Sequence, residues 1–259
     1  MNRFDEKMIV LLRELKENYH AIALKAEFES EGTSAEEALR LTNIATMAGV
    51  DFSLKIGGCG AIKDLYDAKE AGANIIVAPM IESAYALKKF VEAVKTVFLS
   101  ETPKILIDIE TKTAFDSLDE IFASQEFKAI DGVVFGRTDM VNSLGLSTDD
   151  VNNRRIFNMA KKLSLKTQNA GKIFIVGGQV NVQSVDFCKR LPYLLGYETR
   201  KIIFDAPNTL LAGDARGGIL RALEFEMLWL KNKQKSIFPR REDSARIKIL
   251  ESRYKKIQR

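Results

Sequence analysis

Hydrophobic and polar residues alternate with two different periods along most of the chain. Short apolar runs rich in β-branched residues, such as 104–110, have the period of two that is typical of β-strands. Between them lie longer segments, such as 113–124, in which apolar residues recur every three or four positions, as in amphipathic helices. This alternation predicts a parallel β-sheet whose strands are joined by right-handed helical crossovers.

Strand signals, each followed by a helical pattern, fall in the segments 20–28, 51–57, 73–79, 104–110, 130–136, 172–178 and 201–207. A capping box of Ser34 and Glu37 begins the first of these helices, and Gly49 ends it. So many units in one chain favour an α/β fold of the (β/α)8 TIM-barrel type over an open doubly wound sheet. An eighth strand has no clear signal, which leaves a barrel with an irregular or missing first strand as an alternative.

Charge is distributed unevenly between the body of the chain and its end. Residues 231–259 contain eleven Lys/Arg and three Asp/Glu, a local charge of +8, so the remainder carries −4 of the overall +4. We therefore expect a catalytic barrel domain over 1–235 and a basic helical tail over 236–259, with Pro239 at the boundary. An acidic body with a basic tail gives no general signature of nucleic-acid binding.

Other features of the composition indicate a cytoplasmic protein without a membrane partner. The two cysteines do not form a disulfide framework. No apolar run approaches the roughly 20 residues of a membrane-spanning helix, and the N-terminus resembles an amphipathic helix more than a signal peptide.

Charged residues gather toward the carboxyl ends of the predicted strands, the face that carries the active site in a barrel. Strand periodicity turns these side chains toward the barrel interior, and they are Lys25, Glu27, Lys55, Asp108, Glu110 and Asp205. Burying such charges is costly unless they are paired or metal-bound. The cluster is therefore either a functional site or a structural network of ion pairs that closes the top of the barrel.

Two acidic residues end neighbouring strands of this sheet. Glu110 and Asp139 are 29 residues apart, which fits one strand–helix–strand unit. Neighbouring strands lie about 4.8 Å apart, so carboxylates at the tips of such a pair can share one hard cation.

Three stretches follow one another along these strand–helix units: IVAPMIESAYAL, IDIETKTAFDSLDEI and IDGVVFGRTDMVNSLGL. Together they resemble the HpcH/HpaI aldolase and citrate lyase β-subunit family, metal-dependent enzymes of the pyruvate/phosphoenolpyruvate barrel superfamily. Most specific are the I-E-T after one strand and the G-x-x-D-(L/M)-x-x-S-x-G after the next. The resemblance extends from about Ala21 to Leu211.

The resemblance implies that Glu110 and Asp139 bind a divalent cation, Mg²⁺ or Mn²⁺, which chelates a 2-oxo acid and stabilises its enolate. It also implies that the loop Gly136–Arg137–Thr138 offers backbone N–H groups to the substrate carboxylate. Ser83 is a further candidate for lining the substrate site, and Asp108 for supporting it or binding a water.

Two departures from the family pattern concern the reaction itself. The position of a family arginine falls on Lys55, which can still neutralise negative charge but lacks a bidentate fork. The family stretch Asp-x-Glu-His aligns with residues 25–28, where Glu27 is retained and Phe28 replaces the histidine. Proton transfer would then fall to a metal-bound water, Glu27, Lys25 or Lys55.

The resulting hypothesis is a metal-dependent carbon–carbon lyase, similar to a class II aldolase, that acts on a 2-oxo acid through a pyruvate-like enolate. The alternatives are other enolate or acyl chemistry (a citrate-lyase-like acyl lyase, a hydrolase or an isomerase) and a non-catalytic binding barrel. The resemblance also implies a homo-oligomer.

Overall fold

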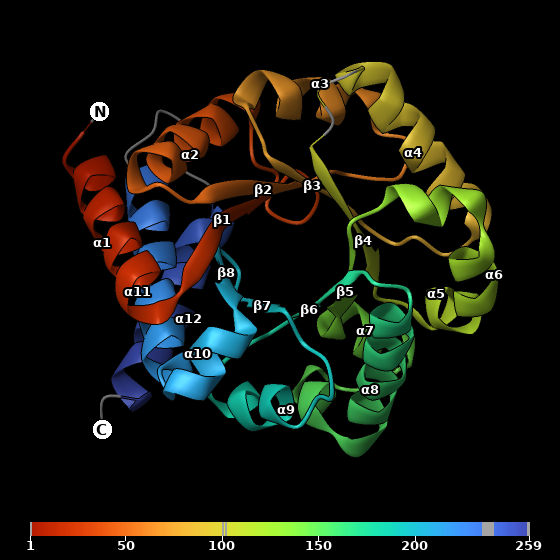
Figure 1. The fold of residues 1–259 in the computed structure, drawn as a ribbon. Helices are drawn as coiled ribbons and strands as arrows, with labels where there is room; N and C mark the ends of the chain where they lie inside the picture. Colours follow the sequence, from red (N-terminus) through yellow and green to blue (C-terminus); the bar gives the residue numbers. More distant parts are fainter. Residues whose placement is uncertain (1, 100, 102, 235–240, 258–259) are drawn as a thin grey trace.

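Eight strands form a closed barrel surrounded by helices (Figure 1). The structure, a computed structural model, describes residues 2–99, 101, 103–234 and 241–257. The strands follow one another around the barrel in chain order: β1 (Ala21–Glu27), β2 (Asp51–Lys55), β3 (Ile75–Ala78), β4 (Lys104–Ile109), β5 (Gly132–Gly136), β6 (Ile173–Gly177), β7 (Gly196–Glu198) and β8 (Ile202–Asp205). The predicted TIM-type barrel is therefore confirmed.

Helices connect the first seven strands on the outside of the barrel. They are α2 (Ala35–Ala48), α3 (Ile62–Ala71), α4 (Ala84–Phe98), α5 (Lys112–Asp116), α6 (Leu118–Ala123), α7 (Arg137–Ser143), α8 (Arg154–Asn169) and α9 (Val185–Lys189), with 3-10 turns η1 (Gln125–Ala129), η2 (Thr148–Asn152) and η3 (Val182–Ser184). The predicted capping box of Ser34 and Glu37 begins α2, and Gly49 ends it in the left-handed conformation. The helix predicted over 113–124 is divided at Ser117.

The last two strands depart from the predicted all-parallel sheet. β7 and β8 form an antiparallel hairpin, and β8 is also antiparallel to β1. The first strand is present and seven residues long, with a register shift between Ala21 and Ala23 in its pairing with β8. The strand without a sequence signal is therefore β7. With three residues, β7 is too short to show a period of two, which is why the pattern missed it.

Apolar side chains fill the barrel in two separate layers. The interior cluster consists of Ala23, Ile75, Val77, Leu106, Val134, Ile175 and Ile203. The larger cluster lies between strands and helices and includes Ile105, Ile107 and Ile109 of β4. The alternation predicted for β4 is therefore confirmed, and it leaves the inward positions beyond Leu106 for Asp108 and Glu110.

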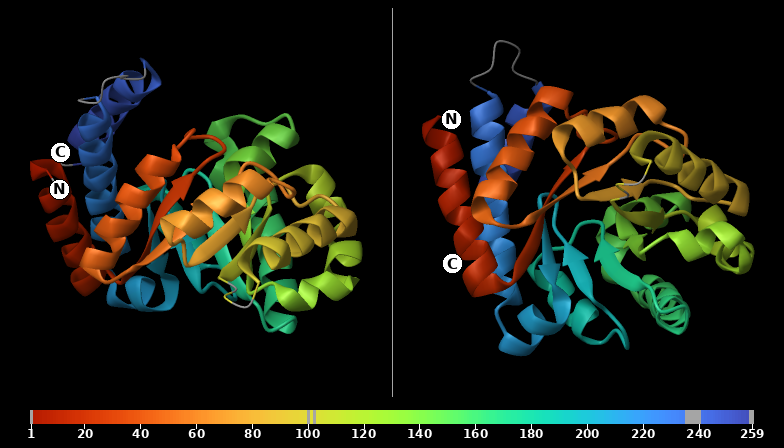
Figure 2. Two further views of the ribbon diagram at one scale, coloured as in Figure 1. Left: turned by 90° about the horizontal axis from the view of Figure 1, so that it is seen from above. Right: turned by 45° about the horizontal axis from the view of Figure 1, so that its top comes forward.

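The N-terminal and C-terminal helices lie side by side on one flank of the barrel (Figure 2). These are α1 (Arg3–Tyr19), α11 (Ala215–Lys233) and α12 (Arg241–Ile257), with the short α10 (Ala206–Ala212) following β8. The Arg221 guanidinium pairs with Glu14 across α11 and α1. No helix of the described residues is both long and apolar enough to cross a membrane. The predicted boundary at Pro239 lies outside the described residues, so the division at 235/236 stays a prediction.

Candidate active site

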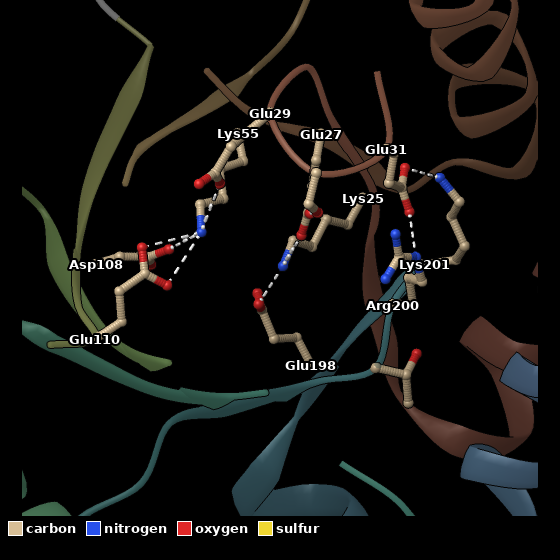
Figure 3. Close-up of polar contacts among 12 residues, drawn as sticks. Lys25, Glu27, Glu29, Glu31, Lys55, Asp108, Glu110, Glu198, Arg200 and Lys201 are labelled. Carbon is tan, nitrogen blue, oxygen red and sulfur yellow. Dashed lines mark hydrogen bonds and ion pairs between the residues drawn. The ribbon is translucent and has the colours of Figure 1, made fainter. Parts of the chain in front are cut away.

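Six charged side chains meet at the carboxyl ends of the parallel strands (Figure 3). Each is 9% exposed or less: Lys25, Glu27, Lys55, Asp108, Glu110 and Glu198. Charges buried to this degree are stable only if they are paired or bind an ion. The structure pairs them in two groups, one around each lysine.

The Lys55 ammonium is the centre of the first group. Its Nζ lies 2.7 Å from Asp108 Oδ2 and 3.1 Å from each carboxylate oxygen of Glu110. Glu29 Oε2, on the loop after β1, lies 3.1 Å away on another side. Burial opposes the charged form, but the Asp108 and Glu110 carboxylates raise the pKa of Lys55 above its ordinary value. The ammonium therefore remains charged at neutral pH.

Glu110 is held by its surroundings on several sides. The Met80 backbone N–H donates to Glu110 Oε1 at 3.0 Å. Burial and the neighbouring Asp108 raise the pKa of Glu110, and the Lys55 ammonium opposes this rise. The Asp139 carboxylate acts in the same direction as Asp108.

The second group surrounds Lys25. Its Nζ contacts Glu198 Oε1 and lies 2.9 Å from Glu27 Oε1, and the Ser30 hydroxyl donates to Glu27 Oε2. Although burial opposes both charges, the two carboxylates raise the pKa of Lys25, and the two lysines lower that of Glu27. Burial raises the pKa of Glu198.

Sequence reasoning missed Glu198 and chose Asp205 in its place. β8 runs antiparallel to its neighbours, so its carboxyl end, with Asp205, lies at the opposite end of the barrel from the site. There the Asp205 carboxylate accepts the Asn208 N–H and caps α10. The prediction that Asp205 joins the cluster is therefore wrong. On the adjacent strand β6, a Cβ on Gly177 would lie 2.7 Å from Glu198 Oε1, so a glycine at this position makes room for the Glu198 side chain.

The Arg137 side chain is fully buried and turns away from the charged cluster. Its Nε donates to the Gly177 carbonyl at 3.0 Å and its Nη2 to the Gly178 carbonyl at 2.8 Å, while Nη1 donates to Asn152 Oδ1 at 2.5 Å. Burial lowers the pKa of Arg137 to about 10. The guanidinium thus fastens the loop after β6 to the start of α7, and only the backbone of Arg137 remains available to a ligand.

The backbone amides of Arg137 and Thr138 lie against Gly178. A Cβ at Gly178 would come within 2.6 Å of the first amide nitrogen and 2.5 Å of the second. The loop after β6 therefore packs so closely against the start of α7 that only glycine fits at position 178. The Ser83 hydroxyl has a structural partner, because its Oγ accepts the Ala86 N–H at 3.1 Å and caps α4.

The donor set has the chemical character of a hard-cation site. No group of three or more His, Cys, Asp or Glu side chains in the described part of the chain is arranged around a common metal position. Glu110 and Asp139, the two carboxylates predicted from sequence, could hold a cation only if waters completed its coordination shell. Asp108 Oδ1 is buried and accepts no hydrogen bond within the described residues, so a bound water or ion would satisfy it.

A closed barrel with charged residues at the carboxyl ends of its strands is the arrangement found in TIM-barrel enzymes. Residues 54–182 match the model of the HpcH/HpaI aldolase/citrate lyase family, and over this segment the chain belongs to that family. The resemblance predicted for about residues 21–211 is confirmed over residues 54–182. Curated protein sequences contain no significant match to this chain.

Solved structures similar to this chain share its fold at low sequence identity. An HpcH/HpaI aldolase/citrate lyase family protein from Burkholderia cenocepacia J2315 aligns at a TM-score of 0.62 and 13% identity, covering 84% of this chain and 90% of its own. An HpcH/HpaI aldolase from Desulfitobacterium hafniense DCB-2 aligns at 0.58 and 15%, covering 90% of each chain. The citrate synthase SbnG aligns at 0.58 and 14%, covering 88% of this chain and 91% of its own. At such identities the likeness shows the fold alone.

Proposed function

We propose that the protein is a metal-dependent carbon–carbon lyase of the aldolase type that acts on a 2-oxo acid through a pyruvate-like enolate. The observation that carries this proposal is the position of two acidic residues at the ends of the adjacent parallel strands β4 and β5. Glu110 directly follows β4, and Asp139 lies in the first turn of α7, which follows β5. The family of residues 54–182 includes aldolases and citrate lyases, which supports lyase chemistry.

Glu110 and Asp139 would hold the cation, Mg²⁺ or Mn²⁺, and Asp108 Oδ1 would accept a hydrogen bond from a bound water. When bound, such a cation acts as a Lewis acid for the developing enolate oxygen. The backbone amides of Arg137 and Thr138 are assigned to the substrate carboxylate, because the family resemblance implies this role for the loop and the Arg137 side chain is engaged elsewhere. Gly136 and Ser83 are the other proposed substrate contacts, and the Ser83 hydroxyl would have to bind a substrate while it caps α4.

The ionisation states of the buried residues indicate which of them could take part in proton transfer. Lys25 and Lys55 have raised pKa values and stay protonated, so they neutralise negative charge on the substrate. Glu27 has a lowered pKa and is ionised at neutral pH. A lowered pKa weakens a carboxylate as a base, so we assign Glu27 to holding the Lys25 ammonium, 2.9 Å away, and not to the role of the family histidine that Phe28 replaces.

Deuterium exchange into pyruvate tests this function. The protein is incubated with pyruvate and Mg²⁺ in D₂O, and the methyl signal is followed by proton NMR. Metal-dependent exchange that is lost in Glu110→Ala, and retained in the exposed-site control Glu120→Ala, supports the proposal. No exchange with any 2-oxo acid or metal would remove it.

A non-catalytic binding barrel is the second candidate function. The observation in its favour is that all six charged side chains of the site are buried and paired with one another. A binding barrel would bind a 2-oxo acid in calorimetry but leave its methyl protons unexchanged.

We also propose that the protein is a homo-oligomer. The amphipathic α1 and the basic α12 lie together on one flank, where a second copy has access to both. Light scattering measures the mass directly, and a monomer at micromolar concentration would exclude the assembly.

A further inference from the structure

The Lys55 ammonium fills the space beside both oxygens of Glu110. An ammonium has three N–H donors, whereas four carboxylate oxygens from Glu29, Asp108 and Glu110 lie within 3.1 Å of this one. Lys55 is 5% exposed and approaches from β2, on the far side of β3 from β4. Figure 3 shows the ammonium directed at Asp108 and Glu110 from across the barrel mouth.

An ammonium in this position opposes a divalent cation on the same carboxylate. Like charges a few ångströms apart repel strongly where water is scarce, and Glu110 is 2% exposed. The two Glu110 oxygens also have few acceptor positions left, because Met80 N–H and the ammonium already use them. A metal on Glu110 would therefore have to displace the lysine.

We propose that Lys55 sets the cation affinity of this site. Its ammonium occupies the position beside Glu110 that a divalent cation needs, so the ammonium and the cation exclude each other from Glu110. The inference rests on the proposed function only in taking Glu110 as a metal ligand. Glu29 gives the displaced ammonium a partner, since its carboxylate already lies 3.1 Å from Nζ and its side chain is 26% exposed at the rim. From there Lys55 would face the carboxylate of an incoming substrate.

Lys25 provides a matched control inside the same mouth. Lys25 is 6% exposed, almost the same fraction as Lys55, and it also contacts carboxylates. Its partners are Glu27 and Glu198, and neither is a proposed metal ligand. Removal of the Lys25 charge changes the net charge of the mouth by the same amount without releasing Glu110.

Titration of metal-free protein with Mn²⁺ alone, followed by the electron paramagnetic resonance of free Mn²⁺, tests the proposal. We expect Lys55→Met to bind Mn²⁺ at least tenfold more tightly than the wild type, because Asp108 and Glu110 are then released as hard oxygen ligands. Lys25→Met is expected to stay within threefold of the wild type. Adding Glu110→Ala to Lys55→Met should abolish the gain.

An affinity of Lys55→Met equal to or weaker than that of the wild type would overturn the proposal. Equal tightening in Lys25→Met would also overturn it, because net charge alone would then explain the effect. If Lys55→Met does not fold, Lys55→Gln replaces it in the same titration, since the amide still donates hydrogen bonds to the carboxylates without a charge. Exchange of pyruvate protons reports the proposed function separately, so tighter Mn²⁺ binding without exchange would keep this inference and remove the function.

Discussion

Gly136 lies directly against the side chain of Glu110, and a Cβ at position 136 would come within 2.6 Å of both Glu110 Cβ and Glu110 Oε2. Gly136→Ala is therefore expected to push Glu110 away from Lys55. Overpacking of this kind costs about 1–3 kcal/mol of unfolding free energy. It should also weaken Mn²⁺ binding, which depends on Glu110. Thermal unfolding and the Mn²⁺ titration measure the two effects.

Gly60→Ala is the matched control for that substitution. Gly60 lies on the loop after β2, at the same face of the barrel, and a Cβ there would meet no atom within 4 Å. Stability and Mn²⁺ affinity should both stay at wild-type values. If Gly136→Ala behaves like Gly60→Ala, the contact with Glu110 does not constrain the site.

A second prediction concerns Arg137, which is fully buried and makes several hydrogen bonds to carbonyl and side-chain oxygens. Arg137→Met leaves these buried acceptors without a donor, and each unsatisfied group costs about 1–3 kcal/mol. We expect a loss of unfolding free energy of at least about 2 kcal/mol, measured by urea denaturation. Arg154→Met, at an exposed position of α8, should change stability by less than about 0.5 kcal/mol. Equal effects of the two substitutions would contradict a structural role for Arg137.

The third prediction is a pH dependence that arises from Glu27. Burial opposes its ionisation, but Lys25 and Lys55 lower its pKa below that of the unfolded chain, where a glutamate titrates near about 4.3. The folded state thus gains stability from Glu27 above that pH and loses it as the pH falls further. Glu27→Gln should be less stable than the wild type at pH 7 by more than about 1 kcal/mol, and the difference should shrink toward pH 3.

Urea denaturation at pH 3.5, 5 and 7 measures this difference between Glu27→Gln and the wild type. Glu120→Gln, at an exposed position of α6, serves as the control and should show almost no difference at any pH. A Glu27→Gln difference that is constant with pH would mean that Glu27 is not held ionised by the lysines.

The fourth prediction distinguishes the two cysteines. Cys188 is 3% exposed, and burial raises the pKa of its thiol to about 11, so little reactive thiolate forms at pH 8. Cys59 is half-buried on the loop after β2. One thiol per chain should react rapidly with a disulfide reagent in the native state and two after denaturation. Cys59→Ser should remove the rapid phase, and its persistence would contradict the burial of Cys188.

The sequence predicts the elements whose periodicity is long enough to read. β1, β4 and α2 show clear patterns, because their buried faces recur over several residues. β7 has three residues, too few for any period. The antiparallel direction of β8 was also not predictable, because Ile202–Asp205 has the same apolar character in either direction and only the short turn before it decides the topology.

The same limit explains the prediction of the site. Lys25, Glu27, Lys55, Asp108 and Glu110 come together as strand parity predicts, because each lies on an inward position of a parallel strand. The alternation of side chains along the strands did not predict which lysine forms an ion pair with which carboxylate. Which lysine meets which carboxylate depends on side-chain reach across the barrel, and the exchange of Asp205 for Glu198 followed from the direction of one strand.

The strand that closes the barrel is made late in synthesis. β1 pairs with β8 through partners such as Leu24 and Ile202, which are 178 residues apart. β1 therefore leaves the ribosome with one unpaired edge and keeps it until the hairpin of β7 and β8 has emerged. Open edges favour aggregation of incomplete chains. A product truncated before Ile202 would lack the pairing of β1 with β8 that closes the barrel. The site at the mouth of the barrel would then be open on one side, so a working barrel requires synthesis through β8.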